Sequence, residues 1–197
     1  MTSNYTEGRT IIDEWNDVEV PPAPKIEAVT LDPQKSAILI LDILRQNCIP
    51  ERRPRCAASV PRIKRLLDKG RGKAVLVTYS IFPQAMISDI IAEVAPLADE
   101  QIVESGPDKF LETKLEEILR EKGIETVVVV GSAAHGAVLH TASAAVFRGF
   151  EVVVPVDGMS SDMAYAEQYT TWHLANAPML GNHIRLTRCD QVSFFDD

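Results

Sequence analysis

Asp42 follows directly after an uninterrupted apolar run, and this position makes it the first candidate for chemistry in the chain. The run Ala37-Ile-Leu-Ile-Leu41 has the length and composition of a buried β-strand. In open α/β sheets, ligands bind beyond the carboxyl ends of the strands. A carboxylate placed there can transfer protons. A structural turn or cap, in which Asp42 bonds to local backbone N–H groups, fits the position equally well.

A second candidate site is the stretch Gly131–Ala142. It follows the β-branched run Thr126–Val130 and is rich in small residues, which indicates a turn from a strand into a helix. Such a turn exposes backbone N–H groups, which can bind an anion. Two candidate sites at strand ends favour a catalytic role for Asp42 over a purely structural one.

Strands and helices alternate along most of the chain. The expected strands cover residues 37–41, 73–79, 101–103, 126–130, 151–154 and 184–187. The expected helices cover about 57–69, 135–148 and 162–176, and a further helix carries the apolar stripe Leu111, Leu115, Ile118 and Leu119 and is ended by Gly123. Apolar strands separated by helices are typical of a parallel sheet that is covered on both faces. We therefore expect an α/β fold, a three-layer α/β/α sandwich around a doubly wound, mostly parallel, six-stranded sheet.

The first 35 residues differ from the rest, being polar and proline-bearing. We expect residues 1–35 to form an extended arm, which wraps over its own domain or a neighbouring subunit or is partly disordered, and residues 36–197 to form one domain. No apolar run approaches the ~20 residues that span a bilayer, and the amino terminus lacks a signal-peptide pattern. The prediction is a cytoplasmic protein with no membrane partner.

The three cysteines have no C-x-x-C spacing, which indicates neither a disulfide scaffold nor a zinc module. We expect reduced thiols. Cys48, six residues after Asp42, is close enough in sequence to approach the pocket, although a buried thiol fits it better. His135 and His140 diverge around a helix, so the prediction is no metal and no cofactor.

The net charge of −8 is unevenly distributed, since residues 45–73 hold ten of the twenty Lys and Arg. This segment is either a local positive field that attracts an anionic small molecule or a solvated loop and helix face. Nucleic acid is not an expected partner, because the rest of the chain is acidic. A set of aromatic residues recurs at helical spacing, namely Tyr165, Tyr169, Trp172 and His173. This spacing favours core packing or a subunit contact over a substrate-binding site.

Taken in order, four segments resemble the isochorismatase-like hydrolases over about residues 36–190. The resemblance implies the three-layer fold, a small-molecule substrate and a homodimer or homotetramer. Most of these hydrolases use an aspartate, a lysine and a cysteine, and the aspartate matches Asp42. The segments are Ala37–Asp42, Lys109–Leu115, the Val-rich strand into Gly131, and Thr141-Ala142 followed by Arg148-Gly149-Phe150.

Counted from Gly131, the cysteine of the resembled family falls on Ala137, which removes covalent catalysis at that position. The resemblance implies that the backbone amides of Ala133 and Ala137 form an oxyanion hole, beside a cis peptide between Ser132 and Ala133. His135 matches an Ala-His pair in the true isochorismatases, where it either bonds to a ligand or caps the helix.

The matching lysine is ambiguous. Aligned on Phe110, it falls on Glu104, and Lys109 is a displaced candidate whose loop could turn it inward or leave it at the surface. If Glu104 faces Asp42 instead, two neighbouring carboxylates raise one pKa and create a proton donor at neutral pH.

One branch of the resembled family, the true isochorismatases, also lacks the cysteine. Their enol ether is cleaved after proton transfer to carbon, so a protonated Asp42 can act as general acid. We expect a hydrolase that acts on a small, anionic metabolite by non-covalent acid/base catalysis. The alternative is a non-catalytic pseudo-hydrolase that binds a metabolite or partner in the ancestral pocket of the resembled family. Amide hydrolysis by water that Asp42 activates ranks lowest.

Overall fold

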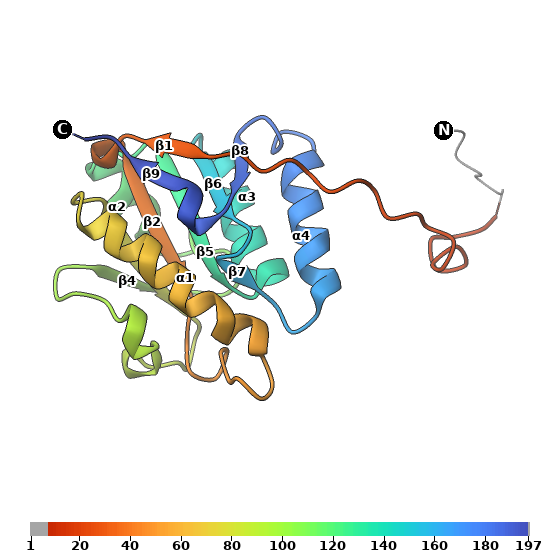
Figure 1. The fold of residues 1–197 in the computed structure, drawn as a ribbon, viewed down its shortest axis with the longest axis horizontal. Coiled ribbons are helices and arrows are strands. Elements are labelled where there is room, and N and C mark those ends of the chain that lie inside the picture. The colour runs from red at the N-terminus through yellow and green to blue at the C-terminus, as the bar shows by residue number, and fades with distance from the viewer. Residues whose placement is uncertain (1–7, 197) are drawn as a thin grey trace.

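A parallel β-sheet forms the centre of the molecule in the structure, a computed structural model that describes residues 8–196. Its strands lie in the order β4-β3-β2-β5-β6-β8, with β7 paired to β5 (Figure 1). The predicted six-stranded, doubly wound sheet is confirmed along this path, and β7 is a short addition. The strands are β2 (Ser36–Leu41), β3 (Leu76–Ile81), β4 (Gln101–Glu104), β5 (Thr126–Ser132), β6 (Glu151–Pro155), β7 (Met159–Ser160) and β8 (Ile184–Thr187).

Four α-helices cover the two faces of the sheet. They are α1 (Pro54–Arg71), α2 (Leu115–Glu121), α3 (Leu139–Phe147) and α4 (Ala164–Asn176). Successive side chains of a strand point to opposite faces. Ile38 and Ile40 therefore pack in one hydrophobic cluster with α1, whereas Leu39 and Leu41 pack in the other with α2, α3 and α4. Burial on both faces explains why the strands read as continuous apolar runs.

Gly131 lets the ends of β2 and β5 approach each other closely. The two strands pair in parallel, with Leu41 opposite Gly131. A Cβ atom on Gly131, whose φ is +153°, would lie 2.2 Å from the carbonyl oxygen of Leu41, so only glycine fits. The next residues, Asp42 and Ser132, consequently leave adjacent strands at the same edge. Asp42 has φ 53°, a left-handed conformation that aspartate tolerates, and the chain turns there.

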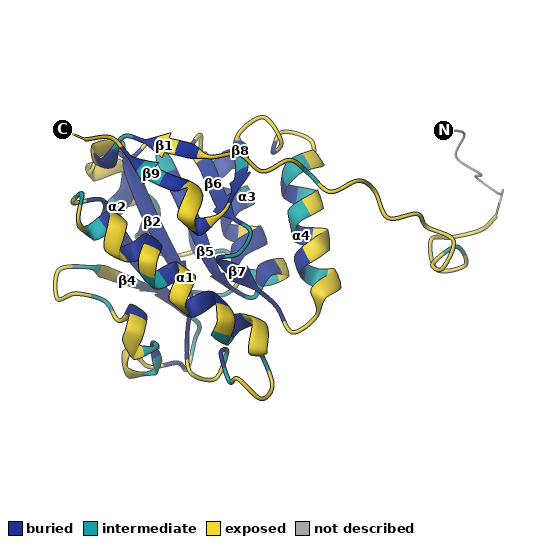
Figure 2. Ribbon diagram, in the orientation of Figure 1, coloured by how far each residue is buried: buried dark blue, intermediate teal, exposed yellow. Residues whose placement is uncertain are grey.

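Two short strands, β1 (Val29–Leu31) and β9 (Val192–Phe194), form a separate parallel pair. The sequence did not predict them, because three-residue strands are too short for a periodic pattern. β1 lies within the segment expected to be an arm, and the domain boundary at residue 36 stays a prediction. Ahead of β1 the chain runs outward past α4 (Figure 1), and almost all of this part is exposed (Figure 2). Within residues 8–196, no helix is both long and apolar enough to cross a membrane.

Candidate active site

Asp42 and Lys109 form a buried ion pair at the carboxyl edge of the sheet. Lys109 Nζ lies 2.8 Å from Asp42 Oδ2, and the lysine side chain is fully buried. The Ser80 hydroxyl, at the end of the neighbouring strand β3, donates to Asp42 Oδ1 at 2.9 Å. Lys109 Nζ also donates to the carbonyl oxygen of Ser105 at 3.0 Å. Both oxygens of the carboxylate thus have a partner on the protein.

The surroundings push the pKa of Asp42 in opposite directions. Burial raises the pKa of Asp42, because a charged carboxylate is disfavoured away from water. The positive charge and hydrogen bond of Lys109 and the hydrogen bond from Ser80 oppose this rise, and the pKa remains above its ordinary value. A carboxyl group in this setting holds its proton to a higher pH than a surface aspartate does.

Glu104 lies away from this pair. It ends the edge strand β4, pairs in register with Ile81 of β3, and is exposed. No hydrogen bond joins it to Asp42 among the residues that the structure describes. The structure therefore brings Lys109 to Asp42 and does not bring Glu104 there. The loop that follows β4 carries Lys109 inward, where its backbone N–H donates to the Thr141 hydroxyl at 3.2 Å.

The turn after β5 is a short π-helix, Ala134–Val138, which continues into α3. The peptide bond between Ser132 and Ala133 is cis, as the sequence predicted. The Ala133 carbonyl accepts from the N–H groups of Gly136 and Val138. Ala133 is half-buried and Ala137 is buried. The tight turn thus follows directly after the edge of the sheet at which Asp42 also lies.

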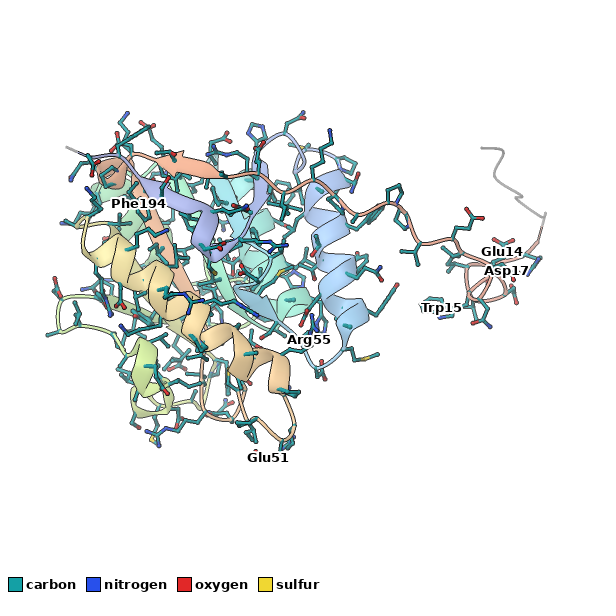
Figure 3. All side chains as sticks on the ribbon, viewed as in Figure 1. Glu14, Trp15, Asp17, Glu51, Arg55 and Phe194 are labelled. Carbon is teal, nitrogen blue, oxygen red and sulfur yellow. A yellow bond between two sulfur atoms is a disulfide. The ribbon has the colours of Figure 1, made fainter. Side chains whose placement is uncertain are left out.

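His135 lies on the exposed side of the same turn. Its Nδ1 is 2.9 Å from the hydroxyl of Ser161, which in turn donates to Asp162 at 3.1 Å. The backbone N–H of Ser161 donates to Glu167 on α4 at 2.8 Å. Arg55 of α1, which Figure 3 labels, binds the same carboxylate. Its Nε lies 2.8 Å from Glu167 Oε1. Residues from α1, α4 and the turn are therefore linked around the rim.

Most of the basic side chains between residues 45 and 73 are engaged in contacts within the protein. Arg55, Arg71 and Lys64 pair with carboxylates. Arg53 is different. It is half-buried, and among residues 8–196 no carboxylate lies within salt-bridge distance of it. Its guanidinium is 3.4 Å from the side-chain oxygen of Asn47, whose amide donates to the Asp42 carbonyl at 3.0 Å.

Two of the three cysteines are not the reduced thiols that the sequence suggested. Cys48, in the loop after β2, and Cys56, in the first turn of α1, form a disulfide. Cys48 is consequently not available as a free thiol beside Asp42. Cys189 is free and buried, and burial raises its pKa well above the ordinary value.

Sequence reasoning missed several polar groups at this edge. Ser80 and Asn47 contact Asp42, and Arg53 contacts Asn47. Ser80 carries a detectable signal, because it is a polar residue at the end of a buried strand.

Two buried hydroxyls without a partner in the described chain, Ser132 and Ser160, face each other in register across β5 and β7. The described residues contain no group of three or more His, Cys, Asp or Glu side chains that could hold a metal ion.

The fold and the site define an α/β protein with a parallel, doubly wound sheet and an Asp–Lys pair at the carboxyl edge of that sheet. A family model described as the isochorismatase domain matches residues 36–184. The chain therefore belongs to the isochorismatase family.

Curated relatives are similar to part of the chain. The secreted isochorismatase effector Isc1 of Verticillium dahliae is 32% identical over 113 residues, which are 52% of this chain and 60% of the relative. N-carbamoylsarcosine amidase of an Arthrobacter species is 26% identical over 110 residues, 55% of this chain and 42% of the relative. These matches span only about half of the relatives' length.

Solved structures match over most of the fold. An isochorismatase-like hydrolase from Alkaliphilus metalliredigens has a TM-score of 0.69 and 26% identity, covering 80% of this chain and 96% of that chain. N-carbamoylsarcosine amidase from Thermoplasma acidophilum also has a TM-score of 0.69, with 22% identity and coverage of 79% and 97%. The second likeness concerns the fold alone.

Proposed function

We propose that this protein is an isochorismatase-family hydrolase that acts on a small, anionic metabolite by non-covalent acid/base catalysis at Asp42. The observation that carries the proposal is the buried Asp42–Lys109 pair at the carboxyl edge of the sheet. A buried ion pair costs desolvation energy that an apolar pair would not, so it indicates a role other than stability.

Asp42 suits the role of general acid. Burial raises its pKa, and a carboxyl group that holds its proton to a higher pH than a surface aspartate can donate that proton to a vinyl carbon. In an enol ether such as isochorismate, this step gives an oxocarbenium ion. Water adds to this ion and returns a proton to the Asp42 carboxylate. The hemiketal then collapses, with its hydroxyl proton passing to the leaving oxygen, and releases pyruvate and an alcohol. Lys109 stabilises the carboxylate that remains on Asp42 after the proton has left.

The turn after β5 suits the binding of developing negative charge. We propose that the backbone N–H groups of Ala133 and Ala137 donate to a substrate oxygen, and that His135 contacts the ligand from the rim. Position 137 carries a methyl group, so a covalent acyl intermediate at that position is not part of the proposal. Proton transfer and backbone anion binding remain available.

Arg53 supports an anionic substrate. It is a half-buried arginine that forms no salt bridge in residues 8–196, two hydrogen bonds away from Asp42, although its charge helps to lower the pKa of Asp162. A guanidinium binds a carboxylate through two parallel hydrogen bonds. Small carboxylates are therefore the substrate class that we propose, and isochorismate and N-carbamoylsarcosine both belong to it. Nicotinamide carries no carboxylate, does not belong to this class, and serves as the neutral amide for comparison.

The first prediction concerns Asp42. We expect purified protein to release pyruvate from isochorismate, and the Asp42→Asn variant to lower kcat by about 10²- to 10⁴-fold, because the isosteric amide cannot donate the proton. A coupled pyruvate assay measures this, with Asp99→Asn as a control at an exposed aspartate. Asp42→Asn turnover within threefold of wild type would remove Asp42 from the mechanism. No pyruvate from the wild type would remove isochorismate as the substrate.

The second prediction concerns Arg53. Assayed on isochorismate, N-carbamoylsarcosine and nicotinamide, the wild type should turn over a carboxylate and not the neutral amide. Arg53→Gln should raise the KM for that carboxylate about 10- to 100-fold, since a charge-assisted hydrogen bond contributes about 1.5 to 3 kcal/mol. Arg52→Gln, at the exposed neighbour, is the matched control. Equal KM values for the two variants contradict the assignment.

The second candidate function is a non-catalytic pseudo-hydrolase. One observation favours it, namely that both oxygens of Asp42 already bond to Lys109 and Ser80. A carboxylate has about four acceptor sites, so this does not block catalysis. If small carboxylates raise the melting temperature while no amide, ester or enol ether shows turnover that depends on Asp42, the binding role replaces the catalytic one.

Two observations bear on the cellular location. The sequence predicts a cytoplasmic protein, whereas one relative is described as secreted and the chain has a disulfide. We retain the cytoplasm as the proposal. The proposed partner is a small molecule.

A further inference from the structure

Ser161 contacts two side chains with its one hydroxyl group. Its Oγ lies 2.9 Å from His135 Nδ1 and 3.1 Å from Asp162 Oδ1. A serine hydroxyl carries a single proton, so it donates one hydrogen bond and accepts others at its lone pairs. Because only 2% of Ser161 is exposed, His135 and Asp162 decide where this proton points.

Asp162 takes the proton of Ser161. A carboxylate only accepts hydrogen bonds, whereas a neutral imidazole has a donor at one ring nitrogen and an acceptor at the other. The pKa of Asp162 lies below its ordinary value, because the Ser161 hydroxyl and the Asp162 backbone N–H donate to it. The charge of Arg53, and that of His135 when it is protonated, favour the carboxylate further. Ser161 therefore donates to Asp162 and presents its oxygen to His135, which must donate from Nδ1.

Glu167 holds Ser161 in the position that this arrangement needs. The Ser161 backbone N–H donates to Glu167 Oε1 at 2.8 Å. Arg55 Nε lies 2.8 and 2.9 Å from the two oxygens of the same carboxylate, which is buried. Arg55 belongs to α1, Glu167 to α4 and His135 to the turn after β5. Three separate elements thus fix one imidazole ring, and the partner of one ring nitrogen sets the state of the other.

A proton on Nδ1 leaves Nε2 of His135 as an acceptor. Nε2 lies on the opposite edge of the ring, and no group within residues 8–196 forms a hydrogen bond with it. His135 is exposed, so this nitrogen is accessible to a ligand. The ring belongs to the same turn as Ala133 and Ala137, the proposed donors to a substrate oxygen. An acceptor at this position binds a hydroxyl or N–H group, not a second carboxylate.

We propose that Ser161 and Asp162 are positioning residues that hold His135 with its proton on Nδ1, so that Nε2 accepts a hydrogen bond from a hydroxyl or N–H group of the substrate. This inference rests on the proposed function and narrows its substrate class. The substrates are small carboxylates that also carry a hydrogen-bond donor. Arg53 binds the carboxylate and His135 the donor, and both act on the same residue, Asp162.

NMR of the ring ¹⁵N nuclei tests the tautomer without any turnover, so its outcome is independent of the catalytic proposal. The ¹⁵N shift separates a protonated from an unprotonated ring nitrogen, and His135→Gln identifies the signals among the four histidines. The wild type at pH 8 should have the proton on Nδ1. Asp162→Asn should move it to Nε2, because the asparagine amide donates to Ser161, whose own proton then turns to Nδ1. Asp99→Asn, at another exposed aspartate, should leave the tautomer unchanged.

Two substitutions of Ser161 complete this test, with circular dichroism to establish that each variant is folded. Ser161→Ala should populate both tautomers, and Ser161→Thr, which keeps the hydroxyl, should restore the wild-type signals. A wild-type ring protonated at Nε2 overturns the assignment. A tautomer that is the same in wild type, Asp162→Asn and Ser161→Ala overturns it as well.

Calorimetry with matched ligands tests the donor group of the substrate. The probes are the three positional isomers of hydroxybenzoate, each paired with its methoxybenzoate, which keeps the carboxylate but cannot donate. In at least one pair, the wild type should bind the hydroxy compound about 3- to 10-fold more tightly, the contribution of one neutral hydrogen bond. Asp162→Asn should abolish this preference, whereas Arg53→Gln should weaken both members of the pair equally.

The outcomes separate this inference from the proposed function. Equal affinities within every pair overturn the donor contact at His135 and leave the carboxylate class intact. A preference that persists in Asp162→Asn overturns the positioning role of Asp162. Absence of binding by all the benzoates, with the expected tautomer seen by NMR, overturns the carboxylate class and the donor contact that rests on it.

Discussion

The buried carboxyl of Asp42 depends on Lys109 for the balance of its charge. Burial and Lys109 shift the pKa of Asp42 in opposite directions, and the rise caused by burial is the larger of the two. A carboxyl whose pKa is raised on folding stabilises the fold below its unfolded pKa and loses that contribution as the pH rises through its folded pKa. The burial of Asp42 thus costs the protein stability at neutral and alkaline pH.

The third prediction follows from this balance. Lys109→Met removes the positive charge but keeps an unbranched apolar side chain, so the pKa of Asp42 should rise further. Carboxyl ¹³C NMR titration measures this shift. The free energy of unfolding at pH 8 should fall by up to about 3 to 5 kcal/mol, since one partner of a buried pair is lost. The loss should be smaller at pH 4, where Asp42 is protonated more readily.

Lys114→Met, at an exposed lysine in the same segment, is the control and should change neither quantity. An unchanged titration of Asp42 in the Lys109 variant contradicts the electrostatic coupling.

Asp42 was predictable from the sequence, whereas its partner was not. A single carboxylate at the end of a buried strand is a local pattern. The choice between Glu104 and Lys109 depends on the path of the loop after β4, which is fixed by distant contacts such as the bond from the Lys109 N–H to Thr141. No local pattern encodes a contact between residues 32 positions apart.

The loop from β2 to α1 and the turn after β5 position the candidate site between them. The long strands were predictable, because apolar runs of five or more residues carry a clear signal. The strands β1, β7 and β9 have only two or three residues each and gave none. The disulfide was also missed, since a spacing of eight residues across a loop and a helix start is not a recognised pattern.

The fourth prediction concerns the disulfide between Cys48 and Cys56. It anchors the loop that carries Asn47 to α1, so both cysteines should be oxidised in the purified protein. Thiol titration in denaturant without reductant should then detect one thiol, that of Cys189, and three after reduction. The Cys48→Ser variant should show two thiols without reduction. Three thiols in the unreduced wild type would contradict the disulfide.

At the scale of the whole molecule, the segment that follows the arm pairs with the C-terminal segment as β1–β9. Val29 and Leu31 are buried there, although they belong to the segment expected to be an arm. The family match begins at residue 36, and the strand pair lies outside it. The fold class could be predicted from composition and alternation, but not the point at which the arm joins the core.

The fifth prediction tests the position at which the arm joins the core. A chain that begins at residue 28 should remain folded. A chain that begins at Ser36 should be less stable by about 3 to 6 kcal/mol, because two buried apolar side chains are lost at about 1.5 to 3 kcal/mol each. Urea unfolding of the two truncated proteins at equal concentration measures the difference. Equal stabilities would place the true boundary at residue 36.

The complete enclosure of Lys109 has a kinetic consequence for the protons on its ammonium group. A side chain with no solvent contact exchanges protons with bulk water only when the surrounding loop opens. The protons of the Lys109 ammonium should therefore exchange no faster than the loop that ends at Lys109 opens. Hydrogen exchange at this one group would report how often the protein admits water to the candidate site.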